Sequence, residues 1–317
     1  MTSANPDPQP STDFAHIPVM LDEVVAVFKT VPEGYFLDAT LGGAGHSSAM
    51  LQNYEGLSLI GIDQDPVAIE VATERLSGFT DRCILCHGRF DQLRELVQEA
   101  GISSLVGFLF DLGVSSPQLD VAERGFSFRH DGPLDMRMDP TSGLSAAVVV
   151  NEYSERDLAR LLRSLGDERH SQRIAAAVVT ARPIQTTTQL AEIVVNAIPA
   201  AARRVGGHPA KRSFQALRIE VNNELDILGP TLEAALDLLV PGGRGAVLTY
   251  HSGEDRIVKD IFRSRTTSID PPGLPVPQHK PDFELLRPVA RQPTNQEVEG
   301  NRRARSARLR TIERVAA

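Results

Sequence analysis

The chain has 317 residues, of which 41% are hydrophobic, enough for one large domain or two modest ones. Its formal net charge of -8 excludes a protein that coats nucleic acid with its whole surface, so an anionic partner must be met by local basic patches. No stretch resembles a signal peptide or an apolar span of about 18 residues, so we expect a cytoplasmic protein without membrane contact.

The amino-terminal residues 1–13 are rich in proline, serine and aspartate and show no periodicity, which predicts a disordered tail. A helix is expected within 16–28, because Leu21, Val24 and Phe28 fall on one face at helical spacing. This helix could cover a ligand or pack on a sheet, and the sequence leaves both alternatives open.

The stretch from 35 to 63 organises the rest of the chain. A short apolar run ends in Asp38 and a second ends in Asp63, as buried parallel strands do. Between them, a glycine-rich turn at 42–45 leads into a helical stretch. Such a turn lets backbone N–H groups approach a ligand, and an acid after the next strand can accept hydrogen bonds from both ribose hydroxyls. The stretch therefore predicts a nucleoside-type cofactor.

The spacing within the turn favours one nucleoside over another. A dinucleotide fingerprint has a third small residue after Gly43 and Gly45, but Ser48 occupies that position. Asp38 lies directly before the turn, where its carboxylate can reach an ammonium group. S-adenosylmethionine, with an amino acid at one end and a ribose at the other, fits better than NAD. The alternatives are an NAD-dependent oxidoreductase and a tight turn that binds nothing.

Alternating strands and helices continue to Asp111, which predicts a parallel, doubly wound sheet. Strands are expected at 83–87 and 105–110, and helices at 66–76 and 93–100. From 114 to 214 the strand pattern stops, and the sequence predicts an inserted helical domain for substrate, with helices near 155–165, 168–181 and 188–197. The sheet domain is then discontinuous, 14–113 and 215–317. Its second part is expected to hold a helix at 213–228, a helix opened by Pro230, and strands at 245–250 and 307–312.

The predicted strand ends gather at one edge of the sheet, where doubly wound proteins bind ligands. Phe90 could flank an adenine there or be a core aromatic residue. Asp111 points at the expected reaction centre, although it could also cap a helix. Cys83 and Cys86 fall on one strand three residues apart and point to opposite faces, so we expect no metal site.

Three consecutive motifs carry a family resemblance: DLGVSSPQLD at 111–120, ERGFSFR at 123–129 and DGPLDMRMD at 131–139. Further matches are HPA at 208–210, FQALRI at 214–219 and EDRIVK at 254–259. From about 16 to 310 the chain resembles the MraW/RsmH family. The resemblance implies a class I methyltransferase, Rossmann-like fold and S-adenosylmethionine-dependent methylation of the exocyclic N4 of a cytidine in the decoding region of small-subunit (16S) rRNA.

The resemblance also carries cofactor-binding positions onto this chain. They are Ala44, Gly45, His46, Asp63, Phe90, Asp111 and Gln118. One departure is Gly253, where the family usually has leucine. A glycine there puts the packing of the adjacent loop in question but not the assignment.

Methyl transfer to an amine is an in-line displacement that needs no metal, so catalysis should rest on proximity and electrostatics. The cytosine N4 lone pair is delocalised into the ring, and an acceptor for its N–H groups would favour attack. Asp111 is the candidate catalytic residue. Ser115 and Ser116 have open roles at the substrate side. Phe126 and Phe128 could stack on a flipped-out cytosine or form a small aromatic core.

Two arginine-rich stretches are candidates for rRNA contact in this acidic protein. The first contains Arg203, Arg204, Lys211, Arg212 and Arg218, and the second spans 302–310. Either could instead be a solvated basic face. Arg124, Arg129 and Arg137 alternate with aspartates, a pattern that fits internal ion pairs as readily as RNA.

The expected partner is small-subunit rRNA, free or in the assembled subunit, and not DNA. Oligomeric state, a homodimer included, stays open, as do the order of substrate binding and the role of His251. A non-catalytic rRNA-binding or assembly factor is the rival outside enzymes. Intact acids at Asp38, Asp63 and Asp111 speak against a decayed active site.

Overall fold

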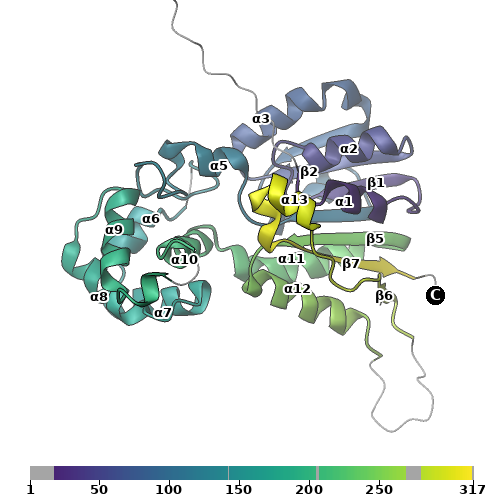
Figure 1. The fold of residues 1–317 in the computed structure, drawn as a ribbon. Coiled ribbons are helices and arrows are strands. Elements are labelled where there is room, and N and C mark those ends of the chain that lie inside the picture. Colours follow the sequence, from purple (N-terminus) through teal and green to yellow (C-terminus); the bar gives the residue numbers. More distant parts are fainter. Residues whose placement is uncertain (1–17, 142, 205–206, 269–279, 316–317) are drawn as a thin grey trace, which may run out of the picture.

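The structure, a computed structural model, describes residues 18–141, 143–204, 207–268 and 280–315. A mixed β-sheet with helices on both faces lies beside a cluster of helices formed by the middle of the chain (Figure 1). The tail predicted at 1–13 lies outside the described residues.

Seven strands form the sheet in the order β3-β2-β1-β4-β5-β7-β6. The first five strands in sequence run parallel, and β7 is antiparallel to both β5 and β6. The strands are β1 (Gly34–Asp38), β2 (Leu57–Asp63), β3 (Cys83–His87), β4 (Leu105–Asp111), β5 (Leu239–Thr249), β6 (Phe283–Leu285) and β7 (Arg308–Arg314). This order, with one reversed strand, confirms the predicted class I methyltransferase fold. The order changes direction between β1 and β4, the point at which such sheets bind ligands.

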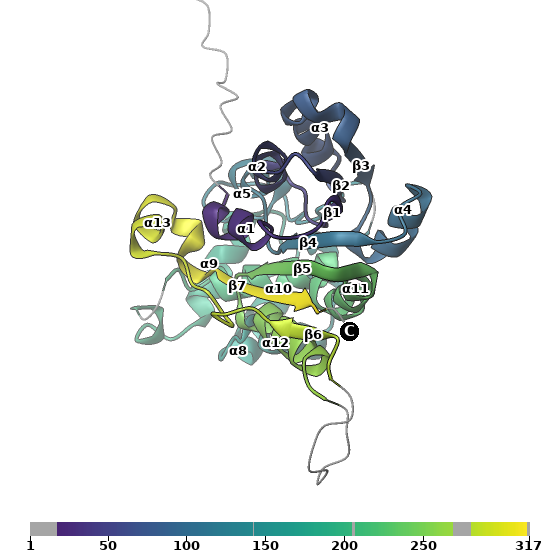
Figure 2. The same ribbon diagram turned by 90° about the vertical axis from the view of Figure 1, so that its right-hand side faces the viewer.

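Each face of the sheet is covered by helices, because successive strand residues point to opposite sides. Phe36 packs into the cluster under α1 (Leu21–Val27), α2 (Gly45–Asn53) and α3 (Pro66–Arg75). Leu37 packs into the opposite cluster, under α4 (Leu93–Glu99), α11 (Glu224–Leu238) and α12 (Ser252–Arg265). Figure 2 shows α1 and α2 on the left of the sheet and α4 and α11 on its right. Helix α13 (Asn295–Gly300) precedes the final strand.

The insertion begins with the short α5 (Ser116–Asp120) and has its own apolar core. Its main helices are α6 (Ala146–Glu152), α7 (Glu155–Gly166), α8 (Ser171–Ala181), α9 (Thr187–Ala197) and α10 (Lys211–Asn222). Phe214 and Leu217 of α10 belong to that core, although the sequence boundary at 214 divides this helix. We therefore propose to divide the domains at the end of α10. The carboxyl ends of the parallel strands face the insertion (Figure 1).

The chain beyond the insertion differs from the prediction in its details. The expected single helix at 213–228 is two helices, because Asn223 adopts a left-handed conformation with φ of 53° and breaks the helical path. Pro230 does not open a helix but lies inside α11, where its fixed φ suits a helix at the cost of one backbone hydrogen bond. Strand β6 is an addition to the strands expected from the sequence. Among the described residues, no helix is both long and apolar enough to cross a membrane.

Candidate active site

Three aspartates end neighbouring strands at the carboxyl edge of the sheet. Asp38 ends β1, Asp63 ends β2 and Asp111 ends β4, with β1 between the other two strands. All three strands are apolar and mostly buried up to these residues, so the first charge on each strand appears at the edge. The sequence therefore placed the three acids on one edge correctly, because burial and strand length fix where each strand ends.

The glycine-rich turn begins helix α2 against the amino-terminal segment. Ala44, directly before the helix, has a left-handed backbone with φ of 56°. A Cβ atom on Gly45 would lie 2.5 Å from the Pro18 side chain, so this close approach needs a glycine. The backbone at Gly45 therefore packs closer to Pro18 than a residue with a side chain could.

Asp63 is oriented by two backbone donors. The Gly42 N–H donates to Oδ2 at 2.7 Å and the Asp65 N–H donates to Oδ1 at 2.9 Å. Each carboxylate oxygen retains a second lone pair, so the group can still accept from the two hydroxyls of a ribose. Burial raises the pKa of Asp63 to about 6, although the two backbone donors act in the opposite direction.

Asp38 is only 2% exposed and accepts from neutral donors. The Ser47 hydroxyl donates to Oδ2 at 2.5 Å, and the Thr40 N–H donates to Oδ1 at 3.3 Å. Burial raises the pKa of Asp38 to about 6, and the Ser47 hydrogen bond and nearby His46 offset part of this rise. A buried carboxylate with such partners fits a cationic ligand, because a positive charge would stabilise its ionised form.

Asp111 has two side chains beside its carboxylate, and its own side chain is 22% exposed. The Tyr250 hydroxyl donates to Oδ1 at 2.6 Å, and His46 Nδ1 lies 3.6 Å from Oδ2. His46 Nε2 lies 3.0 Å from the Val19 carbonyl oxygen, which can only accept, so the proton is on Nε2. At 3.6 Å the Nδ1 contact with Asp111 is an ion pair only when the imidazole is doubly protonated.

Tyr250 was missed as a site residue, because the sequence placed it inside the strand expected at 245–250, whereas β5 ends at Thr249. The ring of Tyr250 lies against Gly113, where an added Cβ atom would be 3.3 Å from the Cδ2 atom of the ring. Burial is the main cause that raises the pKa of Tyr250 well above its ordinary value, and the Asp111 charge adds to it. The signal in the sequence was its position: it directly follows a buried strand beside β4.

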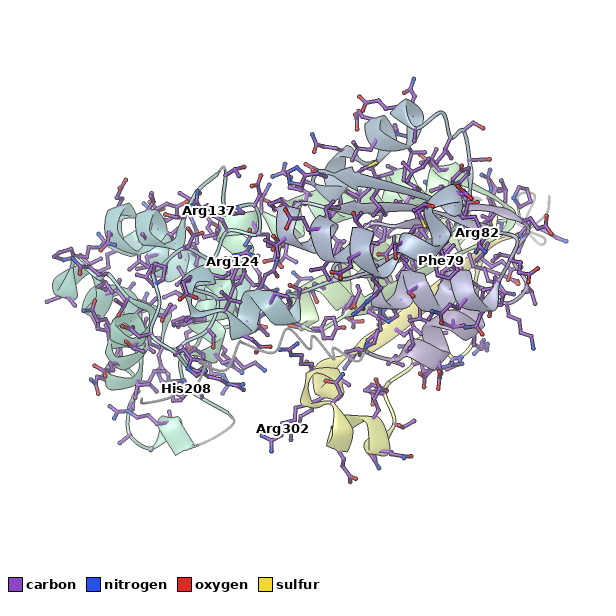
Figure 3. The ribbon with its side chains drawn as sticks, turned by 90° about the horizontal axis from the view of Figure 1, so that it is seen from above. Phe79, Arg82, Arg124, Arg137, His208 and Arg302 are labelled. Carbon is purple, nitrogen blue, oxygen red and sulfur yellow. The ribbon has the colours of Figure 1, made fainter. Side chains whose placement is uncertain are left out.

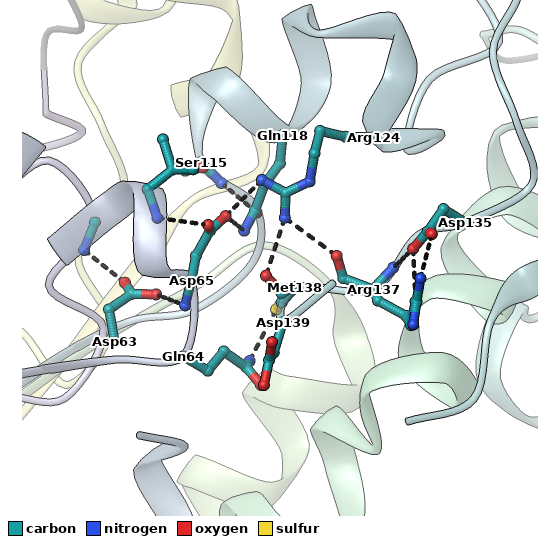
Figure 4. Close-up of polar contacts among 12 residues, drawn as sticks. Asp63, Gln64, Asp65, Ser115, Gln118, Arg124, Asp135, Arg137, Met138 and Asp139 are labelled. Carbon is teal, nitrogen blue, oxygen red and sulfur yellow. Dashed lines mark hydrogen bonds and ion pairs between the residues drawn. The ribbon is translucent and has the colours of Figure 1, made fainter. Parts of the chain in front are cut away.

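Gln118 joins the insertion to the turn after β2 (Figure 4). Its amide donates to Asp65 Oδ2 at 3.1 Å, and its Oε1 accepts from the Ser115 N–H at 3.0 Å. Arg124 Nη1 donates to the same Asp65 oxygen at 2.7 Å, and Nη2 donates to the carbonyl oxygens of Arg137 and Met138. We call Asp65, Gln118 and Arg124 the Asp65 cluster. This cluster attaches the segment that holds Gln118 and Arg124 to Asp65, two residues after Asp63.

The predicted aromatic residues have different surroundings. Phe90 is half-buried and makes an edge contact with Phe110, with ring centroids 5.9 Å apart. Phe126 is only 6% exposed within the core of the insertion, as the aromatic-core alternative expects. Phe128 is half-buried and stacks on the exposed ring of His208 at 4.3 Å. Of the two insertion phenylalanines, Phe128 has the more accessible ring.

The first basic stretch is partly structural. Arg203 donates to the carbonyl oxygens of Ile198 and Asn196 at the end of α9, and Arg212 donates to the Asp167 carbonyl. Lys211 is exposed. The Arg204 backbone lies in a short 3-10 turn, and the side chains of Arg204 and Ser116 are outside the described structure.

Most of the second basic stretch is paired. Arg303 contacts Asp120, and Arg308 and Arg310 both contact Asp255. The side chains of Arg302 and Arg305 are exposed. Seen from above, His208 of the insertion and Arg302 of the carboxyl-terminal segment lie towards the same side of the molecule (Figure 3).

Two remaining features bear on the predicted chemistry. In the described part of the chain, no group of three or more His, Cys, Asp and Glu side chains is arranged to hold a metal ion. A side chain at Gly253 would lie 3.1 Å from His251 Nδ1 and 3.2 Å from Leu225, so the departure from leucine affects packing at the start of α12.

Comparisons with known proteins give the family of this chain. The model of the MraW methylase family matches residues 13–315. A protein of Mycobacterium sp. (strain KMS), named ribosomal RNA small subunit methyltransferase H, is 50% identical over 317 residues, covering 97% of this chain and 86% of that protein. A protein of the same name from Thermobifida fusca (strain YX) is 50% identical over 309 residues, covering 95% of this chain and 94% of that protein.

Solved structures of lower similarity were also found. One is an rRNA methylase from Streptococcus thermophilus, with 13% identity, a TM-score of 0.42, and coverage of 95% of this chain and 100% of that one. Another is a SAM-dependent O-methyltransferase from Thermotoga maritima, with 8% identity, a TM-score of 0.38, and coverage of 94% and 65%. The family match over nearly the whole chain, together with the two close relatives, identifies this protein as a member of the MraW methylase family.

Proposed function

We propose that the protein methylates the exocyclic N4 of a cytidine in the decoding region of small-subunit (16S) rRNA, with S-adenosyl-L-methionine as methyl donor. Family membership and the names of its close relatives support the reaction and the substrate. The observation that carries the chemistry is Asp111, a partly exposed carboxylate at the edge where β1, β2 and β4 end. Because the substrate belongs to the ribosome, we expect the reaction to take place in the cytoplasm.

Each of the cofactor-side residues is suited to a different part of S-adenosylmethionine. Asp63 has two free lone pairs for the ribose hydroxyls, and buried Asp38 suits the ammonium of the methionine end. The turn at 44–46 brings backbone close to the ligand, and Phe90 offers a half-buried face for the adenine. Gln118 is already bonded to Asp65, so its contribution is to hold the insertion beside the cofactor. S-adenosylmethionine supplies an electrophilic methyl group.

Asp111 acts on the nucleophile. The N4 amine of cytosine is a weak nucleophile because its lone pair is delocalised into the ring. A carboxylate that accepts one of its N–H groups orients the remaining lone pair towards the methyl group. It also stabilises the positive charge that the amine gains during attack, so its interaction is stronger in the transition state than in the ground state.

The insertion supplies the substrate side. Phe128 and His208 form an accessible stacked pair, and a base taken out of the RNA stack can lie against such rings. Within the two basic stretches, Lys211 on the insertion and Arg302 and Arg305 on the carboxyl-terminal segment are exposed and can meet phosphates. Paired Arg303, Arg308 and Arg310 serve the fold instead.

The test is a methyl-transfer reaction with isotopically labelled S-adenosylmethionine. Hypomethylated small subunits and naked 16S rRNA are compared as acceptors, and the product is digested with nuclease and identified by mass spectrometry. We expect N4-methylcytidine at a single position in the decoding region, and a rate at least about a hundredfold lower for Asp111→Ala. Methyl groups on a carbon atom of the base, or none on either acceptor, would contradict the proposal.

A further inference from the structure

The carboxylate of Asp111 needs a fixed orientation if it is to accept from an incoming amine. A short hydrogen bond from the Tyr250 hydroxyl, 2.6 Å long, fixes Oδ1. Hydrogen bonds to a charged acceptor are stronger than neutral ones, so this contact holds the rotamer of Asp111. None of the sequence motifs described above includes Tyr250 or gives it a part in the reaction.

The position of Tyr250 is itself fixed by Glu254. Glu254 Oε2 accepts from the Tyr250 N–H at 2.7 Å and from the His251 N–H at 3.2 Å. Glu254 is only 2% exposed. Burial acts to raise its pKa, but His251 and Arg218 outweigh burial and leave the pKa of Glu254 below its usual range. A buried, ionised glutamate thus holds the backbone from which the Tyr250 ring extends.

A positive charge that lies near Glu254 belongs to Arg218 of the insertion. Arg218 on α10 binds Glu224 through two hydrogen bonds of 2.8 Å, and its Nη2 atom lies 3.8 Å from Glu254 Oε1. His251 Nε2 lies 3.0 Å from the same oxygen. A continuous series of contacts therefore runs from the insertion through Glu254 and Tyr250 to Asp111.

We propose that Tyr250 is a positioning residue for methyl transfer, which holds the Asp111 carboxylate in the orientation that receives the cytosine amine. Glu254 and Arg218 fix Tyr250 in turn, so the seating of the insertion and the orientation of the reactive carboxylate are linked. This inference rests on the proposed catalytic role of Asp111. A tyrosine that only filled space beside Gly113 would not need its hydroxyl.

Tyr250→Phe removes the hydroxyl and keeps the ring. Tyr153→Phe is the matched control, because the Tyr153 hydroxyl donates to Glu220 Oε1 at 2.9 Å within the insertion. For Tyr250→Phe we expect single-turnover methyl transfer to fall on the order of tenfold, less than on loss of Asp111 itself, with cofactor affinity nearly unchanged. Tyr153→Phe should react at the wild-type rate. Equal rates for wild type and Tyr250→Phe would overturn the proposal.

The pH profile separates positioning from a structural effect. The ionisable groups that face Asp111 are His46 on α2, Asp38 at the end of β1 and Tyr250 after β5. A donor to the charged form favours that form, so its removal moves the acid limb of the rate profile to higher pH. Tyr250→3-fluorotyrosine keeps the fold and makes the hydroxyl a stronger donor. It should move the same limb to lower pH, and it serves even if Tyr250→Phe folds poorly.

A double-mutant cycle distinguishes this inference from the role of Asp111. If Tyr250 acts through Asp111, Tyr250→Phe should cause no further loss in the Asp111→Ala background. A full further loss there would mean that Tyr250 acts independently and would overturn the inference alone. A wild-type rate for Asp111→Ala would instead remove Asp111 from catalysis. A third outcome is that Asp111→Ala reacts slowly while Tyr250→Phe reacts at the wild-type rate with an unchanged acid limb of its pH profile. That result would keep the catalytic role of Asp111 and exclude Tyr250 as its positioning residue.

Discussion

At the scale of single residues, the carboxyl groups of Asp38 and Asp63 make the stability of the protein depend on pH. Burial raises the pKa of each to about 6, and their hydrogen-bond donors are neutral N–H and hydroxyl groups. In the free protein these raised values mean that the folded state binds more protons than the unfolded state between about pH 4 and 6. The contribution of both groups to the free energy of unfolding therefore decreases as the pH rises through that window.

Cofactor affinity should have the opposite dependence on pH. The ionised form of Asp38 attracts the cationic end of S-adenosylmethionine, so we expect the dissociation constant to fall as the pH rises through about 6, with release of protons on binding. Calorimetry in two buffers of different ionisation enthalpy measures both quantities. An affinity that stays constant across the pH range around this pKa would show that Asp38 does not meet the ammonium group.

Asp63 gives a second prediction at the scale of one residue. Asp63→Ala removes the acceptors for the ribose hydroxyls and should weaken S-adenosylmethionine binding by about 1.5–3 kcal/mol, the range for hydrogen bonds to a charged group. Calorimetry on the folded variant measures the change. Asp157→Ala, which alters an exposed ion pair on α7, is the control. Unchanged affinity in folded Asp63→Ala would place the ribose elsewhere.

At the scale of elements, the Asp65 cluster joins α3 to the start of the insertion. Asp65 is 3% exposed, and the Arg124 side chain is 15% exposed, so their ion pair lies largely out of water. Asp65 also accepts from the Val67 N–H at the start of α3. One carboxylate therefore caps a helix of the sheet domain and anchors the substrate-side segment.

Breaking this pair should cost far more than breaking an exposed one. Arg124→Ala leaves Asp65 buried without its cation, and we expect the free energy of unfolding to fall on the order of 3 kcal/mol. Arg160→Ala removes the partner of Asp157 in an exposed pair, and the change there should stay below about 1 kcal/mol. Urea unfolding of both variants gives the comparison. Similar small changes in the two would mean that water reaches the Asp65 cluster.

Elements of the sheet were predictable from sequence to different degrees. Strands β1, β2 and β4 are continuous apolar runs that end in aspartate, so their type and their final residues followed from local pattern. The prediction that Pro230 opens a helix was wrong. The local preference of proline for a first turn is outweighed by the packing of α11, in which Leu228 and Leu232 are buried. Local signals do not contain that packing.

The contacts that complete the site could not be predicted. Tyr250 meets Asp111 across 139 positions of sequence, and Arg124 meets Asp65 across 59. Both contacts depend on which strands become neighbours and on how the insertion lies against the sheet. The alternation of arginine and aspartate at 124–139 fitted internal ion pairs as readily as RNA contact, and it could not identify Asp65 as the partner of Arg124.

At the scale of the whole molecule, we expect the binding of rRNA to depend on Lys211, Arg302 and Arg305. Joint reversal of Lys211, Arg302 and Arg305 to glutamate should weaken binding of the small subunit. It should also reduce the slope of log affinity against log salt by about 0.7 for each phosphate that the protein no longer neutralises. Cofactor affinity should stay constant. Arg160→Glu, on an exposed face of α7, is the control. An unchanged salt slope in the triple variant would exclude these residues from the RNA interface.

The two chain crossings between sheet domain and insertion have a mechanical consequence. The chain leaves the sheet just after Asp111, where the Leu112 N–H bonds to Leu248, and it returns at Asn223, beside the Arg218–Glu224 ion pair. Both crossings lie next to the contacts that orient the reactive carboxylate, whereas α8 and α9 lie at the far end of the insertion (Figure 1). A rigid rocking of the insertion on a bulky ribosomal surface would therefore pivot near Asp111. The outer helices would sweep the largest arc while the reacting groups stayed almost still.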